Sequence, residues 1–258
     1  MKKITALLLV LIMVFALAAC GQKDKTMVYA VEAGSAGEAA ALENSFEINS
    51  VDTQAKALME VDAGTSDAAI IDSLMAGAMV GEGTSYPDLV VTDQKLTEEL
   101  YGAGCRKGSD LAAYINDVMS EAYADGTMQK LAETYGVQAA LVEQPAATGS
   151  TPAADGDVAY IQGKGTLVVG ITDFAPMDYK DDNGEWIGFD ADMAKIVAEK
   201  LGVEIQFVEI DWDNKVFELD GKAIDVVWNG MTLTDAMLAA MECTNAYCNN
   251  AQVVVTKG

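Results

Sequence analysis

Short apolar runs that alternate with amphipathic stretches constrain the fold of this chain more than any other feature of its sequence. Each run is rich in valine, isoleucine or alanine and is bounded by polar or turn-forming residues, a pattern typical of buried strands. When such strands alternate with helical segments, they form α/β units around parallel sheets. The pattern therefore predicts an α/β fold, with strands near residues 28–33, 68–72, 89–92, 167–171, 204–210, 224–228 and 252–255.

The helical pattern is clearest over residues 190–201. Met193, Val197 and Leu201 fall on one face of a helix with 3.6 residues per turn, and the next residue is Gly202. Glycine readily adopts the left-handed conformation that ends many helices. This segment is therefore predicted to be a helix that packs on the strand after it.

The first residues have the pattern of a secretion signal. Lys2 and Lys3 precede an apolar stretch over residues 4–17, which is shorter than the roughly 20 residues that span a membrane. The sequence Leu-Ala-Ala-Cys at residues 17–20 resembles the bacterial lipobox. This resemblance implies a signal peptide over residues 1–20, acylation of Cys20 and an exported chain anchored by lipid at the extracellular face of the cell membrane. The alternative is an ordinary secretion signal with a cysteine there by chance.

The composition argues against several classes of function. Lysine and arginine number 16 against 40 aspartates and glutamates, so the formal net charge is −24, and histidine is absent. Such a surface repels phosphate backbones, so no nucleic-acid partner is expected. Without histidine, the commonest general base and metal ligand at neutral pH is missing. We therefore expect no catalytic residue, no metal and no cofactor.

Three cysteines remain beyond residue 20, namely Cys105, Cys243 and Cys248. Their spacing matches no zinc motif. They are either small core residues or one disulfide with a spare thiol. The sequence leaves both alternatives open.

One segment differs in amino-acid composition from the rest of the chain. Residues 144–156 read QPAATGSTPAADG, with almost nothing that a core would bury. Segments rich in proline, glycine, alanine, serine and threonine form flexible linkers. This linker divides the chain into residues 26–143 and residues 157–258.

Both parts contain motifs that resemble one known family. The second part contains GTLVVGITDFAPMDYKDDNGEWIGFD, AIDVVWNGMTLTD and NAYCNNAQVVVTKG, and it resembles the first lobe of the family 3 periplasmic solute-binding proteins. The first part contains VYAVEAGSAGEAAALE, SDAAIIDS and SDLAAYINDVMSEAYADGTMQKLAETYG, and it resembles that family's second lobe followed by its C-terminal helices. The resemblance implies a two-lobe periplasmic-binding-protein type II fold with a ligand cleft between the lobes.

The order of the parts differs from that of the family, in which the lobe found here at residues 157–258 comes first. The chain is therefore interpreted as circularly permuted, with its free ends at the hinge and one of the two usual hinge crossings broken. The expected domains are a smaller lobe at 26–97, helices of the larger lobe at 98–143, the linker at 144–156 and the larger lobe at 157–258.

In the smaller lobe, the resemblance places Asp72 where an aspartate binds the ammonium of an amino acid. The alternative is a helix N-cap. The loop Gly34, Ser35 and Ala36 leads into a predicted helix whose backbone N–H groups can bind the ligand's carboxylate, although the loop alone reads only as a turn. Glu32 stands at a position that is often basic or polar in the family.

In the larger lobe, Phe174 and Trp212 match two aromatic walls of the family's cleft, whereas Trp228 lies inside a strand and is assigned to the core. Met237 stands where the family usually has an arginine that clamps the carboxylate. The pocket is thus more acidic than usual, which favours a cationic or neutral ligand. The segment that contacts the ligand through its backbone and a threonine is Asn229, Gly230, Met231 and Thr232.

These features together predict a monomeric, extracellular substrate-binding lipoprotein that delivers an amino-acid-like ligand to an ABC transporter permease. One alternative is a cyclohexadienyl-type dehydratase on the same fold, which would need a placed acid and base. The other is a ligand-sensing receptor domain. The sequence does not identify the ligand.

Overall fold

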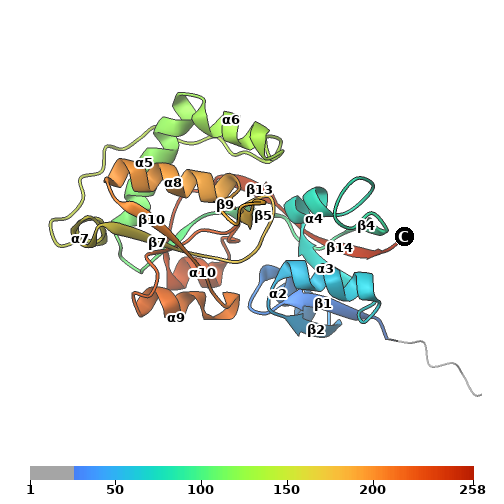
Figure 1. The fold of residues 1–258 in the computed structure, drawn as a ribbon. Coiled ribbons are helices and arrows are strands. Elements are labelled where there is room, and N and C mark those ends of the chain that lie inside the picture. The colour runs from blue at the N-terminus through green and yellow to red at the C-terminus, as the bar shows by residue number, and fades with distance from the viewer. Residues whose placement is uncertain (1–25) are drawn as a thin grey trace, which may run out of the picture.

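The computed structural model describes residues 26–258, which form two α/β lobes that lie side by side (Figure 1). The predicted signal peptide at residues 1–20 and the predicted lipidation site Cys20 lie outside the described residues. None of the helices within residues 26–258 is long and apolar enough to cross a membrane.

The smaller lobe is built on a five-stranded sheet with the order β2-β1-β3-β14-β4. The first three of these strands in the chain pair in parallel, and β14 is antiparallel to both of its neighbours. Its strands are β1 (Val28–Glu32), β2 (Glu47–Val51), β3 (Ala68–Asp72), β4 (Leu89–Lys95) and β14 (Gln252–Lys257), and its helices are α2 (Ala36–Glu43), α3 (Gln54–Ala63) and α4 (Ser73–Met79).

The larger lobe contains a second five-stranded sheet with the order β10-β7-β11-β6-β12. Its strands are β6 (Gly104–Cys105), β7 (Thr166–Ile171), β10 (Glu204–Glu209), β11 (Val226–Val227) and β12 (Glu242–Cys243). Two short antiparallel pairs join β5 (Glu99–Tyr101) to β13 (Cys248–Asn250) and β8 (Tyr179–Lys180) to β9 (Trp186–Ile187). The helices are α5 (Leu111–Ala124), α6 (Thr127–Thr134), α7 (Asp157–Lys164), α8 (Phe189–Leu201), α9 (Lys215–Asp220) and α10 (Asp235–Ala240), with a 3-10 turn η1 (Trp212–Asn214).

The predicted α/β class is confirmed, and each apolar run contains one strand. The helix predicted over 190–201 is α8, which buries Met193, Val197 and Leu201 and ends at Gly202 with a φ of 73°. Because Gly202 has no Cβ, it adopts this left-handed conformation without steric cost.

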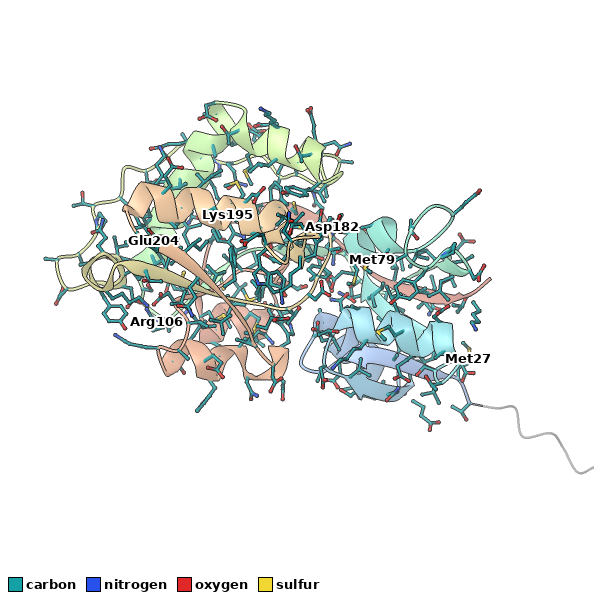
Figure 2. The ribbon with its side chains drawn as sticks, viewed as in Figure 1. Met27, Met79, Arg106, Asp182, Lys195 and Glu204 are labelled. Carbon is teal, nitrogen blue, oxygen red and sulfur yellow. The ribbon has the colours of Figure 1, made fainter. Side chains whose placement is uncertain are left out.

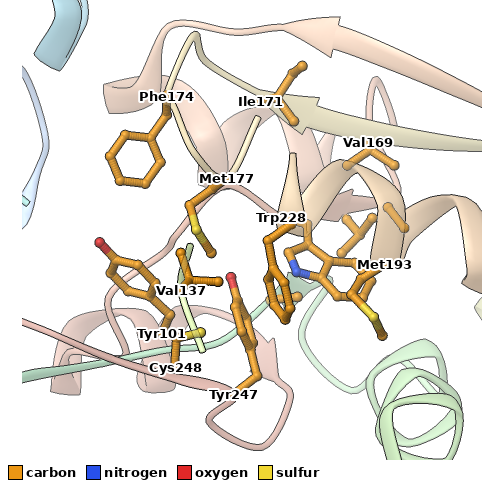
Figure 3. Packing of buried hydrophobic residues seen from close by; sticks show 14 of the residues in the cluster. Tyr101, Val137, Val169, Ile171, Phe174, Met177, Met193, Trp228, Tyr247 and Cys248 are labelled. Atoms are coloured by element: carbon orange, nitrogen blue, oxygen red, sulfur yellow. The ribbon is translucent and has the colours of Figure 1, made fainter. Parts of the chain in front are cut away.

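Segments far apart in the chain share the core of the larger lobe. Figure 3 shows Tyr101 and Val137 packed in one cluster with Met193, Trp228 and Tyr247. Trp228 is 1% exposed, so its assignment to the core is confirmed. Helix α5 contacts α6, α7 and α8, and β6 lies in the same sheet as β7. Residues on both sides of the 144–156 linker therefore bury one another's apolar surface.

Buried ion pairs join the same two parts of the chain. Arg106 donates to Asp157 at 3.0 Å and to Asp225 at 3.3 Å, and its guanidinium also donates to the backbone carbonyl of Ile224 at 2.8 Å. Figure 2 shows Arg106 in the larger lobe, on the side away from the smaller lobe. Since a buried guanidinium needs acceptors for its N–H groups, these bonds fix the register of β6 against α7 and β11.

The predicted boundary of the larger lobe was wrong at its end. Residues 157–258 were assigned to that lobe, but β14 pairs with β3 and β4 in the sheet of the smaller lobe. The physical reason is that residues 252–255 are all buried, so the strand needs neighbours on both sides and cover on both faces. β14 has both in the smaller sheet, between β3 and β4.

The chain crosses between the lobes twice, at residues 96–98 and at Ala251. Both crossings are therefore intact, contrary to the expectation of a broken one. The free ends are also not at the hinge. Val28 and Lys257 lie at the outer end of the smaller sheet, in strands that flank β3 on either side, because β1 begins there and β14 ends there.

The linker at residues 144–156 contains no helix or strand, yet helix α5 holds it by hydrogen bonds. The carboxylate of Asp117 accepts from the backbone and hydroxyl groups of Thr148 and Ser150 at 2.6–3.1 Å, and Asp110 accepts from the backbone of Ala153 at 3.0 Å. Slight burial raises the pKa of Asp117, but the bonds from Ser150 and Thr148 outweigh it and lower that pKa to about 2.

Candidate ligand-binding site

A cavity of about 280 Å³ lies between the two lobes. The ends of β1 and β3 and the start of α2 form its wall in the smaller lobe, and segments near β7, η1 and β11 form its wall in the larger lobe. The structure places all the residues predicted to bind ligand around it, namely Glu32, Gly34, Ser35, Ala36, Asp72, Phe174, Trp212, Asn229, Gly230, Met231, Thr232 and Met237.

The turn after β1 brings backbone groups to the cavity. Gly34 has a φ of 68°, and its N–H donates to Glu38 at 2.9 Å. The hydroxyl oxygen of Ser35 accepts from the backbone N–H of Glu38 at 3.0 Å and so caps α2. The oxygen of Ser35 thus serves the helix, while its hydroxyl proton is free to point toward a ligand.

Asp72 ends β3 and occupies the N-cap position of α4, but its side chain makes no cap hydrogen bond. Its carboxylate instead accepts from the side-chain amides of Gln54, Asn250 and Gln252. Burial and the nearby carboxylate of Glu99 raise the pKa of Asp72 to about 7. Asp72 is therefore the N-cap residue of α4 by position, but its carboxylate is held by amides from other elements and does not cap α4.

Glu32 is the carboxylate of the cavity with an unused oxygen. Its side chain is 3% exposed, and its Oε1 has no hydrogen-bond partner among the described residues. Burial, and next the charge of Asp72, raise the pKa of Glu32 to about 8. A buried oxygen without a hydrogen-bond partner is costly, so this atom is suited to accept a hydrogen bond from a ligand.

The wall of the larger lobe is fixed by Asn229. Its Oδ1 accepts from the backbone N–H and the hydroxyl of Thr172 at 3.0 and 2.7 Å, and its Nδ2 donates to Asp178 at 2.8 Å. The amide is therefore fully used within its own lobe. The side chain of Asn229 therefore shapes the wall, and only its backbone groups remain available for the predicted contact with the ligand.

Phe174 and Gly230 pack so closely that the glycine is required. A Cβ added at Gly230 would lie 2.3 Å from Cε1 of Phe174, and the φ of Gly230 is 55°. The backbone N–H of Gly230 donates to the buried carboxylate of Asp190 at 2.7 Å. The close packing against Gly230 holds the phenyl ring of Phe174 at the cavity wall, and the bond to Asp190 holds the backbone of Gly230.

Thr232 also lines the cavity, and its hydroxyl group donates to Glu99 at 3.0 Å.

Lys215 lines the cavity and was missed by the sequence analysis. Its side chain is buried, and its ammonium lies 4.7 Å from the ring centroid of Trp212. Trp212 and Lys215 are three residues apart, which is about one helical turn, so the sequence did indicate that their side chains lie on the same face. Other lining residues that were missed are Glu38, Ala39, Leu42, Gln54, Thr172, Thr234 and Ala236.

The charges of the cavity do not balance. Among the described residues that line it, Glu32, Glu38 and Asp72 are acidic, and Lys215 is the basic residue. Met237 adds a thioether in place of a charge. A ligand that brings positive charge would lower the cost of ionising the buried carboxylates, since a nearby cation favours their charged form.

Part of the chain is similar to known proteins. Residues 167–258 match the family described as bacterial extracellular solute-binding proteins, family 3. Over 100 residues the chain is 33% identical to the L-cystine-binding protein TcyJ of Escherichia coli K12, which covers 38% of each chain. Over 93 residues it is 36% identical to a probable amino-acid ABC transporter-binding protein of Haemophilus influenzae, which covers 36% of each chain.

A third relative is the arginine-binding extracellular protein ArtP of Bacillus subtilis, at 31% identity over 96 residues and 37% of each chain. These alignments span well under half the length of the relatives. Among solved structures, an ancestral cationic amino acid solute-binding protein is similar at 40% identity, over 32% of this chain and 36% of the other, with a TM-score of 0.31.

Proposed function

We propose that this chain, whose residues 167–258 match the bacterial extracellular solute-binding proteins, family 3, is the extracellular substrate-binding lipoprotein of an ABC importer. In this proposal it binds a free amino acid, or a similar small zwitterion, between its lobes and delivers it to the permease as a monomer. The relatives are named for binding amino acids and, in one case, for an ABC transporter.

The observation that carries the proposal is a buried carboxyl group and a buried ammonium group that both line the cavity and have unused hydrogen-bonding capacity. Glu32, on the smaller lobe, has an oxygen without a partner among the described residues, and Lys215, on the larger lobe, lines the same cavity. A zwitterion offers a group of each sign and can satisfy both. The excess of carboxylates favours a cationic or neutral amino acid over an acidic one.

A thermal-shift screen of the standard amino acids tests the proposal, because a ligand that prefers the native state raises its melting temperature by mass action. We expect the largest shift from a cationic or neutral amino acid. Calorimetry on the mature protein then gives the affinity. A screen in which no amino acid shifts the melting temperature, repeated by calorimetry with the same result, would contradict the proposal.

We also propose that the chain is a circular permutant of this family. What supports this is the shared core of residues 98–142 and 157–250 and the spacer-like composition of residues 144–156. A gene that encodes 157–258 first and 26–143 second tests it. In this gene residue 258 is joined to residue 26. The junction is short, because β14 and β1 lie on either side of β3 and are therefore two strand spacings, about 10 Å, apart. We expect the rearranged protein to fold and to bind the same ligand.

The lipid anchor at Cys20 is a further part of the proposal. Leucine and two alanines precede this cysteine, as in a lipobox. Mass spectrometry of the protein from bacterial membranes would identify acyl groups on Cys20, and a Cys20→Ala variant should lose them and be released from the membrane. An unmodified Cys20 in the processed protein would contradict the anchor.

The dehydratase remains the second candidate function because Glu32 and Asp72, both in the cavity, have pKa values raised to about 8 and about 7. Acids with pKa values near neutrality suit proton transfer. We nevertheless expect binding without turnover, since Asp72 already accepts from three amides. A turnover assay with a cyclohexadienyl acid distinguishes the two functions.

A further inference from the structure

The ammonium group of Lys215 lies at the boundary between the two lobes. Lys215 is the first residue of α9, in the larger lobe, and is 4% exposed. Its Nζ donates to the backbone carbonyl of Trp212 at 2.9 Å, within its own segment, and to the carbonyl of Gly34 at 3.0 Å, in the smaller lobe. The second bond joins the lobes directly across the cleft.

One donor of Lys215 is unused. An ammonium group has three N–H donors, and the two bonds to carbonyls use two of them. No carboxylate within the described residues forms an ion pair with Lys215. Burial lowers the pKa of Lys215, and the charges of Glu32 and Asp213 offset only part of this effect. The buried cation therefore has a free N–H and no anion in contact with it.

The neighbourhood of that N–H suits a carboxylate. Gly34 accepts from Lys215 in the turn that leads to Ser35 and the first residues of α2, and the positive end of the dipole of α2 faces the cavity there. An anion at this place meets the helix start from the smaller lobe and the ammonium from the larger lobe. The cavity offers no second basic residue among the described residues that line it.

We propose that Lys215 binds the carboxylate of the ligand and, through its bond to Gly34, couples that contact to closure of the lobes. This inference rests on the proposed function, since it assigns the partner of one group of an amino-acid ligand. Lys215 then acts as a specificity-determining residue. It distinguishes acids from their uncharged derivatives, because an amide offers a carbonyl but no negative charge to the buried ammonium.

Calorimetry with a ligand and its amide tests the assignment. The first probes are L-arginine and L-argininamide, or the corresponding pair for the amino acid with the largest thermal shift. The wild type should prefer the acid by about 10- to 100-fold, the usual range for a hydrogen bond to a charged group. In Lys215→Met the preference should fall to a few-fold, because the variant keeps the length of the side chain and loses its charge and donors.

Two controls separate this effect from damage to the fold. Lys130→Met removes an exposed lysine of α6 in the same lobe and should leave the preference unchanged. Lys215→Arg keeps the charge and should retain part of the preference for the acid. The circular dichroism spectrum of each variant reports whether it is folded, and the affinity for the amide reports whether its cavity is intact.

The outcomes distinguish the two proposals. If the wild type binds an amino acid and Lys215→Met binds the amide normally but still prefers the acid as strongly as the wild type, Lys215 does not bind the carboxylate, although the proposed function stands. If Lys215→Met loses the acid and the amide equally, Lys215 acts only through closure, and the assignment of the carboxylate is wrong. A wild type that binds no amino acid overturns the proposed function and this inference with it.

Discussion

Asn250 donates a side-chain hydrogen bond to the carboxylate of Asp72, and this bond joins the last residue of β13 in the larger lobe to the last residue of β3 in the smaller one. The same amide nitrogen of Asn250 also donates to Glu99 at 3.0 Å, next to the other crossing. Asp72 is therefore both part of the cavity wall and part of the hydrogen-bond network at the hinge.

The first prediction concerns the charge of Asp72. Asp72→Asn replaces an acceptor by an amide that faces the donors of Gln54, Asn250 and Gln252. We expect it to weaken binding of a cationic or neutral amino acid by about 1.5–3 kcal/mol, the range for a hydrogen bond to a charged group. Calorimetry measures the change, and an unchanged dissociation constant would remove Asp72 from the site.

Asn250→Ala is the matched control for this prediction. Asn250 does not line the cavity, so its loss removes the bond at the hinge and no ligand contact. We expect a smaller loss of affinity than for Asp72→Asn. Equal losses in the two variants would show that Asp72 acts through the hinge and not through the ligand.

The second prediction concerns lobe closure. A Cβ added at Gly34 would lie 2.7 Å from the Cα of Asp213 in the opposite lobe, so Gly34→Ala should prevent full closure. We expect at least about a tenfold loss of affinity, since a ligand that contacts both lobes loses one of them. Small-angle scattering should show a smaller radius of gyration on ligand binding for the wild type and little change for Gly34→Ala.

Gly64→Ala supplies the control for this effect. Gly64 has a φ of 76°, close to the 68° of Gly34, but a Cβ at Gly64 meets nothing within 4 Å. Both variants therefore carry a similar backbone strain of about 1–2 kcal/mol. Only Gly34→Ala should lose affinity, and a similar loss in both variants would contradict the role of Gly34 in closure.

The third prediction is that stability falls as the pH rises through neutrality. Burial raises the pKa of Glu32 to about 8 and those of Asp72 and Asp190 to about 7. A carboxyl whose pKa is raised by folding contributes stability that is fully present below its unfolded pKa, near 4, and is lost as the pH rises through the folded value. The melting temperature of the ligand-free protein should thus be several degrees higher near pH 5 than near pH 8.

Asp190→Asn checks the origin of this pH dependence. Asp190 lies in the core of the larger lobe and accepts from Tyr247 at 2.6 Å and from the backbone of Gly230. Since asparagine has no proton to lose in this range, the variant should show a flatter dependence of melting temperature on pH. A dependence as steep as that of the wild type would show that Asp190 does not contribute to it and would leave Glu32 and Asp72 as its source.

The fourth prediction concerns the linker. Asp117→Ala removes the acceptor of Thr148 and Ser150, so residues 146–151 should exchange backbone hydrogens and be cleaved by proteases faster than in the wild type. Glu121→Ala, on the same helix but without a linker contact, should not have this effect. Because the pKa of Asp117 is lowered to about 2, its contribution is present above the unfolded pKa and is lost only as the pH falls toward 2.

The sequence predicted the α/β class and the residues around the cavity because both depend on local patterns and on motifs that each lie within one segment. Asp72 ends an apolar run, and Gly34 follows another, so their place at the ends of parallel strands could be predicted. The position of β14 could not, because a strand buried on both faces fits either sheet, and only its pairing with β3 and β4 decides between them.

Lys215 shows a different limit of sequence reasoning. A lysine one turn from Trp212 is more often a solvated surface residue, and nothing local indicates that its ammonium is buried. Its burial depends on the carbonyl of Gly34, which is 181 residues away in the chain. Similarly, composition indicated a flexible linker, whereas its hydrogen bonds to Asp117 depend on how α5 lies beside it.

The enclosure of the cavity by both lobes has a kinetic consequence. Under the proposed function, separation of the lobes breaks the bond between Lys215 and Gly34, so this bond should slow opening and lengthen the residence time of the ligand. Substitutions at this contact should therefore raise the dissociation rate constant more than they lower the association rate constant. If the chain delivers its ligand to a transporter, as proposed, a transporter that separates the two lobes would accelerate release without contacting the ligand.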